Sequence, residues 1–329
     1  MTAANPRIDS APQIAVERVD TCAVCGADSF SWAADGFDYE LRTCRNHWTF
    51  VRCSECGHLW LNPRPAVAEL ATIYPATYYA YTYRDSVNPV ALRAKDFLDQ
   101  RKLSKIIGAL PQMPQSFLDI GCGDGRFLKL MAGRGVARTA CYGLELDENA
   151  VRPLAAAGYS VYCERVEDTT SIPDGSIALA TMFHVIEHVD DPGAVLARLA
   201  PWLSPSGVLA LETPNIDSLD RRLFSNGYWG GYHIPRHWNL FSRGTITRLL
   251  ERCGFEVMDI EFKTGHSFWM YSIHHRILYG RPSLPRVAAL FDPLRSVVPL
   301  AAFTTFDLAR ARLGARTSSM LVLAKRRGM

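Results

Sequence analysis

The stretch FLDIGCGDGRFLKLM, residues 117–131, joins an apolar run to an amphipathic run through a loop rich in glycine. Three of the five residues from 121 to 125 are glycine, and Asp119 stands two residues before the first of them. Glycine adopts positive φ and lets other atoms approach the main chain, while a helix N-terminus offers free N–H groups. The stretch therefore predicts a strand, a tight turn and a helix that bind a ligand through the backbone. A turn without a ligand is the alternative.

The spacing of the glycines separates two classes of cofactor. Dinucleotide-binding folds read G-x-G-x-x-G, but here Gly121, Gly123 and Gly125 alternate and Arg126 stands where that pattern needs glycine. The sequence D-x-G-x-G-x-G resembles motif I of the class I S-adenosylmethionine (SAM) methyltransferases. This resemblance implies that Asp119, Gly121, Cys122 and Gly123 belong to a SAM site.

The composition is that of a soluble globular protein. The 329 residues are 48% hydrophobic and 21% charged, and no apolar run approaches the ~18–20 residues that span a bilayer. Residues 1–13 lack the basic-then-apolar form of a signal peptide. We therefore expect a cytoplasmic protein without a transmembrane segment. Its nine cysteines are expected to bind metal or pack in the core, not to form disulfides.

Charge is distributed unevenly along the chain. The net charge is +3, yet the residues from 264 onward carry ten Lys and Arg against two acids, a net charge of +8. This region predicts either a solvated basic face or a site for an anionic acceptor, phosphorylated, nucleotide-linked or lipid-linked. Residues 264–313 also mix aromatic and short apolar stretches. They predict helices that pack on the sheet, with a lid over the acceptor or peripheral contact with a membrane as alternatives.

Two C-x-x-C-G turns, residues 22–26 and 53–57, predict a zinc site. Two such turns supply the four thiolates of a tetrahedral zinc cage. The expected ligands are Cys22, Cys25, Cys53 and Cys56. Four thiolates leave no open position for water, so the zinc is expected to be structural. Cys44, His47 and His58 are reserve ligands.

Strands and helices are expected to alternate from residue 116 onward. Strands are expected near 116–120, 139–147, 159–163, 177–188, 208–214, 255–262 and 318–326, and helices near 90–110, 125–135, 148–158, 191–203 and 243–253. Repeated strand–helix units imply a parallel sheet with helices on both faces. The predicted fold is α/β, with a Rossmann-like seven-stranded, mostly parallel sheet, a small N-terminal zinc-ribbon-like module and a helical C-terminal insertion.

The expected organisation has six parts. They are a disordered tail (1–19), a zinc-binding module (20–62), a tyrosine-rich and helical connector (63–115), a SAM-binding core (116–263), a helical lid or acceptor region (264–316), and a final strand with a basic tail (317–329).

Further cofactor residues are expected at the ends of the following strands. Glu145 lies 20 residues after Gly125 at the end of the second strand, where an acid can hold both ribose hydroxyls. Leu146 is assigned to the same site, and Glu167 to the edge of the adenine. Phe183 and His184 end the fourth strand, at the edge where open α/β sheets bind ligands.

Five segments carry the wider resemblance to class I SAM methyltransferases across residues 116–263. They are LDIGCGDG, YGLELDENAV, FHVIEHVDDP, LSPSGVLALETPN and FSRGTITRLLERCGFEV. The two cysteine turns, the tyrosine-rich stretch after them and YHIPRHWNLFS, residues 232–242, resemble bacterial sugar and natural-product methyltransferases with an N-terminal zinc module.

This second resemblance implies catalytic residues and an acceptor. His237 is the first candidate for the general base and His233 the second, while Tyr79, with Tyr78, would close the pocket. The sugar C-methyltransferases carry an acid where this chain has Arg236, which favours O-methylation of a sugar, a glycan precursor or a related natural product. Arg236, together with the basic region after residue 263, would suit a phosphorylated, nucleotide-linked or lipid-linked acceptor. A C- or N-methyltransferase is the alternative. Two other classes remain open: a zinc-ribbon nucleic-acid-binding or RNA-modifying protein, which the modest charge disfavours, and a SAM-fold protein without activity.

The sequence His184-x-x-Glu187-His188 also fits a motif of zinc proteases. That motif lies inside a helix, whereas here it is expected to begin at a strand end. A weaker alternative is that His184, Glu187, His188 and His233 hold Mg²⁺ or Mn²⁺, as in some methyltransferases that act on vicinal hydroxyls.

Overall fold

The computed structural model describes residues 10–75 and 89–327, and the described chain divides into two compact units. Unit 1 contains residues 10–75, 214–246 and 262–320. Unit 2 contains residues 89–213, 247–261 and 321–327. Each unit is therefore built from three separate stretches of the sequence.

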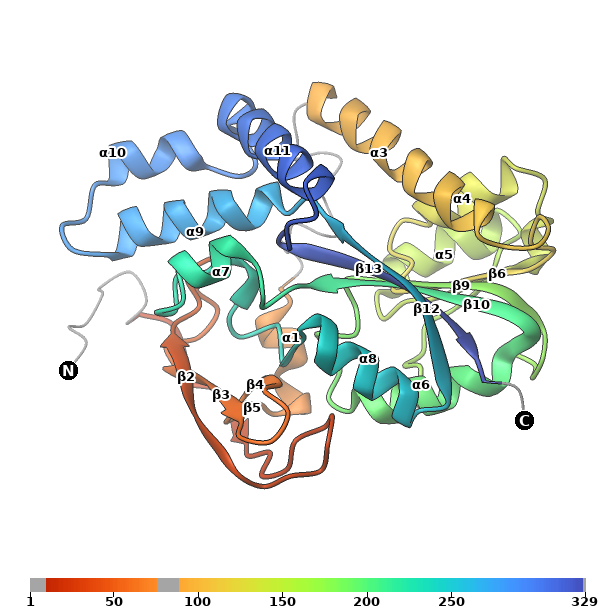
Figure 1. The fold of residues 1–329 in the computed structure, drawn as a ribbon, viewed down its shortest axis with the longest axis horizontal. Helices are drawn as coiled ribbons and strands as arrows, with labels where there is room; N and C mark the ends of the chain where they lie inside the picture. Colours follow the sequence, from red (N-terminus) through yellow and green to blue (C-terminus); the bar gives the residue numbers. More distant parts are fainter. Residues whose placement is uncertain (1–9, 76–88, 328–329) are drawn as a thin grey trace. The chain divides into compact units, whose positions relative to one another are not determined.

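A seven-stranded sheet forms the centre of the methyltransferase-like region (Figure 1). Its order is β12-β13-β10-β9-β6-β7-β8. The strands are β6 (Phe117–Ile120), β7 (Cys141–Leu144), β8 (Ser160–Tyr162), β9 (Ile177–Phe183), β10 (Leu203–Pro214), β12 (Phe255–Lys263) and β13 (Ser319–Arg326). β6 pairs in parallel with β7 and with β9. β7 also pairs in parallel with β8, and β10 pairs in parallel with β9. The predicted Rossmann-like, mostly parallel sheet is confirmed.

Helices alternate with these strands where the sequence predicts them. They are α3 (Pro89–Gly108), α4 (Arg126–Ala132), α5 (Glu148–Ala156), α6 (Pro192–Leu199) and α8 (Arg243–Arg252). Two begin at aspartate N-caps, which satisfy N–H groups of the first turn. The carboxylate of Asp147 accepts from the N–H of Asn149 at 2.9 Å, and that of Asp191 accepts from Ala194 at 3.0 Å.

The core of unit 2 lies around β6. It contains the fully buried Phe117, Leu128, Met131 and Leu179, with Leu103 of α3 in the same cluster. Because every residue of β6 is buried, the strand fixes the position of the glycine bend that follows it.

Unit 1 contains a four-stranded antiparallel sheet in the order β11-β4-β3-β2. The strands are β2 (Phe30–Gly36), β3 (Trp48–Cys53), β4 (Leu59–Leu61) and β11 (Asn239–Leu240). β11 joins this sheet from a distant part of the sequence. A shorter pair is formed by β1 (Val16–Glu17) and β5 (Arg64–Pro65). The core of the unit includes Trp48, Phe50, Trp229 and Tyr232.

The helices of unit 1 come mainly from its C-terminal stretch. They are α1 (Leu70–Ile73), α7 (Leu219–Leu223), α9 (His266–Tyr279), α10 (Pro285–Ala288) and α11 (Val297–Arg312). α9 contacts both α10 and α11, and the three helices lie side by side in Figure 1. No helix of the described residues is both long and apolar enough to span a membrane.

Candidate functional site

The glycine bend between β6 and α4 has the backbone that the sequence predicts. Gly121, Gly123 and Gly125 all have positive φ, at 72°, 51° and 72°. A Cβ at Gly121 would lie 2.6 Å from Val185, and one at Gly125 would lie 2.3 Å from Leu154. A Cβ at Gly123 would meet nothing within 4 Å. The outer glycines are therefore required by packing, while Gly123 borders open space that suits the close approach of a cofactor.

Glu145 follows β7 and reaches the bend. Its Oε2 accepts a hydrogen bond from the N–H of Gly123 at 2.9 Å, and its Oε1 accepts from Leu146 at 2.7 Å. A carboxylate beside the carboxyl ends of β6 and β7 has the position that ribose hydroxyls need. Leu146 is 59% exposed, an apolar side chain at the place where a base would pack. These residues fit SAM by their chemistry, and their roles stay predictions.

Asp119 is buried beneath the bend. The hydroxyl of Thr181 donates to its Oδ1 at 2.6 Å. Burial raises the pKa of Asp119 to about 7, and the nearby Glu145 adds to the increase while Thr181 opposes it. The side chain of Cys122 is also buried. Asp119 and Cys122 therefore support the bend from inside, and the backbone and Glu145 are the parts that a ligand would meet.

The remaining predicted cofactor residues lie at or near the same edge of the sheet. Phe183 ends β9, and its ring is 4.8 Å from that of Phe127. Glu167 forms an ion pair with Arg165 at 3.0 Å and is half-buried. Glu167 thus has a protein partner, and its assignment to the adenine edge stays a prediction.

His184 lies in a network of charged groups after β9. Its Nδ1 is 3.0 Å from Glu187 Oε1, and its Nε2 is 3.6 Å from Glu212 Oε1. Burial acts to lower the pKa of His184, but the two carboxylates raise it to about 9. The side chain of His184 is 40% exposed. The assignment of His184, Glu187, His188 and His233 to Mg²⁺ or Mn²⁺ stays a prediction.

Lys102 of α3 extends the same network. Its Nζ lies 2.5 Å from Glu212 Oε2 and 4.4 Å from the ring centre of Phe183. Burial acts to raise the pKa of Glu212, but Lys102 and His184 hold it well below its usual range. Neither residue was predicted to belong to the site. Lys102 lies outside the five segments of the resemblance, and Glu212 lies within LSPSGVLALETPN, where it was assigned no role.

The protease reading of His184-x-x-Glu187-His188 does not fit the local structure. β9 ends at Phe183 and α6 begins at Pro192, so the three residues lie in the turn between them. The motif is outside a helix, as the sequence predicts.

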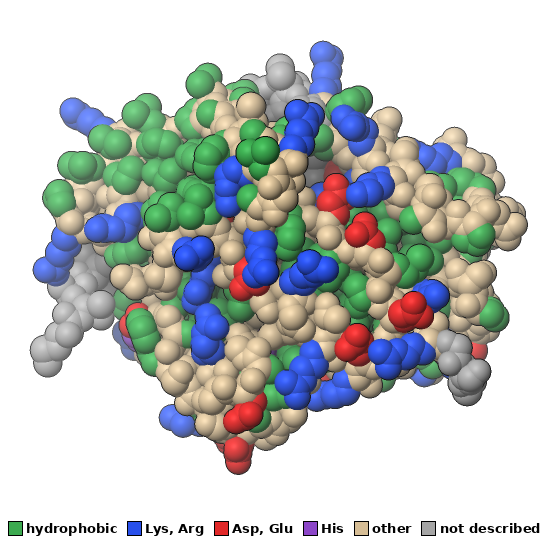
Figure 2. Space-filling model, viewed as in Figure 1, with side chains coloured by type: hydrophobic (Ala, Val, Ile, Leu, Met, Phe, Trp, Pro, Cys, Tyr) green, Lys and Arg blue, Asp and Glu red, His purple; other side chains and the backbone are tan. Residues whose placement is uncertain are grey.

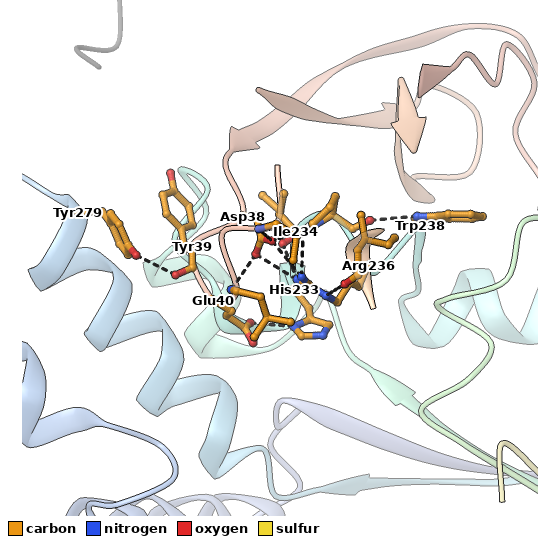
Figure 3. Close-up of polar contacts among 12 residues, drawn as sticks. Asp38, Tyr39, Glu40, His233, Ile234, Arg236, Trp238 and Tyr279 are labelled. Carbon is orange, nitrogen blue, oxygen red and sulfur yellow. Dashed lines mark hydrogen bonds and ion pairs between the residues drawn. The ribbon is translucent and has the colours of Figure 1, made fainter. Parts of the chain in front are cut away.

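The two candidate base histidines belong to unit 1 and lie beside each other. Their ring centres, at His233 and His237, are 4.9 Å apart. His233 Nδ1 is 2.8 Å from Glu40 Oε1 (Figure 3), and both side chains are buried. His237 Nδ1 donates to the carbonyl of Gly231 at 2.8 Å. Because that carbonyl only accepts, Nδ1 of His237 carries a proton.

A small pocket adjoins the Glu40–His233 pair, with room for about one water molecule. It is lined by Phe37, Tyr39, Glu40, Gly227, Trp229, Tyr232, His233, Ile234 and His275. Glu40 Oε2 is buried and accepts no hydrogen bond from the described residues. Burial acts to raise the pKa of Glu40, but His233 lowers it overall. A buried, charged oxygen beside a pocket is a site for an O–H or N–H donor.

Arg236 has a structural position. Its guanidinium is fully buried and forms two hydrogen bonds to the carboxylate of Asp38, at 3.1 and 2.9 Å (Figure 3). Its Nε donates to the carbonyl of Ile73. The suggestion that Arg236 binds a phosphorylated acceptor is therefore wrong, because its charge is already paired and inaccessible. Tyr78 and Tyr79 lie outside the described residues.

The four predicted zinc ligands converge in unit 1. The Sγ atoms of Cys22, Cys25, Cys53 and Cys56 lie within 4.8 Å of one another. Cys22 and Cys56 are 3.6 Å apart, and Cys25 and Cys53 are 3.5 Å apart. Tetrahedral zinc with Zn–S bonds of about 2.3 Å places its sulfurs about 3.8 Å apart. The cysteine cluster therefore has the dimensions of a zinc site.

The reserve ligands have other partners. His47 Nε2 is 2.9 Å from Asp35 Oδ2, and His58 Nε2 is 3.2 Å from Asn239 Oδ1. Burial lowers the pKa of His58 to about 4. Cys44 packs in the core of unit 1.

The sheet order, the glycine bend and the acid after β7 together define a class I methyltransferase. A family model described as a methyltransferase domain matches residues 83–260, more than half of the chain. The chain therefore belongs to this family, and the resemblance to SAM-dependent methyltransferases is confirmed.

Individual relatives are more distant. A ubiquinone biosynthesis O-methyltransferase of Thiobacillus denitrificans is 29% identical over 171 residues, which cover 50% of this chain and 62% of the relative. A probable S-adenosylmethionine-dependent methyltransferase of Mycolicibacterium smegmatis is 34% identical over 143 residues, covering 43% and 52%. The chain thus spans less than two thirds of either relative. A solved SAM-dependent methyltransferase from Archaeoglobus fulgidus is 19% identical, with a TM-score of 0.44. The match covers 70% of this chain and 94% of the solved one.

Proposed function

We propose that this protein transfers the methyl group of SAM to a hydroxyl of a small molecule. We choose a hydroxyl as the acceptor group because of the buried Glu40–His233 pair, which lies beside His237 and a pocket. SAM supplies an activated methyl group when bound. A hydroxyl that accepts this methyl group must also lose its proton, and histidine is the usual base near neutral pH.

The bend after β6 and Glu145 would hold the cofactor. Gly123 lets the methionine part approach the main chain, and Glu145 binds the ribose hydroxyls. Leu146 would pack against the adenine.

Residues of unit 1 would bind and deprotonate the acceptor. His237 is the proposed base, because its Nδ1 proton is fixed by the Gly231 carbonyl and its Nε2 lone pair can take a proton. Glu40 positions His233, whose ring packs edge-on against that of His237. A positioned base contributes about 10²–10⁴-fold to the rate.

The acceptor is proposed to be a sugar, a glycan precursor or a related natural product. The ubiquinone biosynthesis O-methyltransferase of Thiobacillus denitrificans also acts, by its name, on oxygen. Arg236 is buried and paired with Asp38, so it would not bind a phosphorylated acceptor. The exposed arginines of the C-terminal helices would suit a lipid-linked acceptor.

The cysteine cluster is proposed to bind one structural zinc ion. Four thiolates would close its coordination shell, so the metal would stabilise the β2–β3–β4 region and take no part in methyl transfer.

Transfer of label from isotopically labelled SAM to fractionated extracts tests the function. Wild type should transfer the label to a small molecule that carries it as a methyl ether, bonded to oxygen. His237→Ala should lower the rate by about 10²-fold or more. His47→Asn is the matched control, because His47 is exposed and its ion pair is with Asp35, which does not line the pocket. Label found on carbon or nitrogen, or equal rates for wild type and His237→Ala, would overturn the proposal.

A further inference from the structure

The C-terminal helices of unit 1 expose their apolar side chains. α11 is a 16-residue helix of mostly apolar sequence, yet its one buried residue is Asp307. Val298 of this helix is 80% exposed, and Leu313 directly after it is 86% exposed. Leu290, between α10 and α11, is 61% exposed. The apolar residues therefore face solvent while the acid faces inward, the reverse of the usual pattern.

This inversion is fixed by the contacts of Asp307. Its Oδ2 accepts from the N–H of Gly265 at 3.0 Å, and its Oδ1 lies 3.1 Å from Arg310 and 3.3 Å from Trp269 Nε1. The ring of Trp269 stacks on Phe303 with centres 5.4 Å apart. α11 is thus anchored to α9 through one face, and the anchoring leaves its other apolar residues outside.

Exposed arginines surround these apolar side chains, without exposed acids. Arg281, Arg286, Arg295 and Arg312 are all exposed. The acids of the same segment, Asp292 and Asp307, are half-buried and buried. Figure 2 shows hydrophobic side chains gathered over α9, α10 and α11, with Lys and Arg among them.

We propose that this apolar and basic surface, residues 281–313, docks on a membrane that contains anionic lipids. Apolar side chains of such a surface enter the boundary between headgroups and acyl chains, and arginines bind the lipid phosphates. The charges favour a membrane over a second copy of the chain. A two-fold contact would bring this surface against itself, and the four arginines would then repel one another.

Sedimentation of the full chain with vesicles tests this proposal, independently of methyl transfer. Wild type should bind vesicles of mixed phosphatidylcholine and phosphatidylglycerol, with weaker binding at high salt and to phosphatidylcholine alone. Replacing Leu290, Val298 and Leu313 by Gln should weaken binding about tenfold or more. Replacing Arg286, Arg295 and Arg312 by Gln should do the same and reduce the salt dependence.

Leu223→Gln with Met258→Gln is the matched control, because both residues are exposed and apolar but lie outside residues 281–313. This control should bind like wild type. The proposal is overturned if wild type does not sediment with anionic vesicles, or if the apolar variant binds as tightly as wild type. A dimer in sedimentation equilibrium that the apolar variant dissociates would instead assign the surface to a second copy.

Discussion

His233 Nδ1 lies 2.8 Å from Glu40 Oε1, and both side chains are buried although 193 residues separate them in the sequence. The pair lines a pocket in unit 1 and adjoins His237. A carboxylate in this position orients the imidazole through a hydrogen bond. The pair is therefore central to the proposed deprotonation of the acceptor.

Glu40→Gln separates the two histidines as candidates for the base. The amide keeps the shape of the side chain but removes its negative charge, which favours a protonated neighbour. If His237 is the base, the rate should fall about tenfold while the acid limb of the pH–rate profile moves little. A large shift of that limb to lower pH would assign the base to His233.

Asp119→Asn should change how stability depends on pH. The pKa of Asp119 is raised from 3.8 to about 7. A carboxyl group whose pKa is raised by folding stabilises the folded chain fully when the pH is below its pKa in the unfolded chain. This stabilisation is lost as the pH rises to its pKa in the folded chain. The free energy of unfolding of wild type, relative to the variant, should fall between about pH 4 and pH 7, by up to about 1.4 kcal/mol per pH unit. Urea denaturation over this range measures it, and a constant difference would show that Asp119 is ionised in the folded chain.

Gly123→Ala should weaken SAM binding without unfolding the protein. The added Cβ meets no atom of the chain within 4 Å, so the cost to folding is the strain of positive φ, about 1–2 kcal/mol. Gly135→Ala is the matched control, since Gly135 also has positive φ and open space but lies after α4. Calorimetry should show at least tenfold weaker binding only for Gly123→Ala. Equal affinities of the two variants would place the cofactor away from the bend.

Zinc content should depend on the four clustered cysteines alone. Cys22→Ser with Cys53→Ser should lose about one zinc ion per chain and lower the melting temperature. Cys44→Ser and Cys163→Ser should keep the metal, because both thiols lie outside the cluster. Metal analysis of the purified variants provides the comparison. Zinc retained by the double variant would rule out the four-thiolate site.

The glycine bend was predictable because its signal is local. Gly121, Gly123 and Gly125 follow a buried strand directly, and the caps at Asp147 and Asp191 mark helix starts within a few residues. The order of strands and helices follows from the same local patterns.

Contacts between distant segments were not predictable. Arg236 pairs with Asp38 across 198 residues, and a positive charge in a sequence does not reveal whether a partner neutralises it. Pairing of Asn239–Leu240 with Leu59–Leu61 likewise has no local pattern. Glu40 is one acid among many in the sequence, and only the fold places it beside His233.

Titration calorimetry of SAM tests the central claim most directly, because it needs no knowledge of the acceptor. Wild type should bind one SAM per chain, and Glu145→Gln should bind at least about tenfold more weakly, since it loses charge-assisted hydrogen bonds. Glu148→Gln, a neighbouring exposed acid at the start of α5, should bind like wild type. No heat of binding with wild type, or equal affinity for Glu145→Gln, would contradict a cofactor site formed by the bend and Glu145.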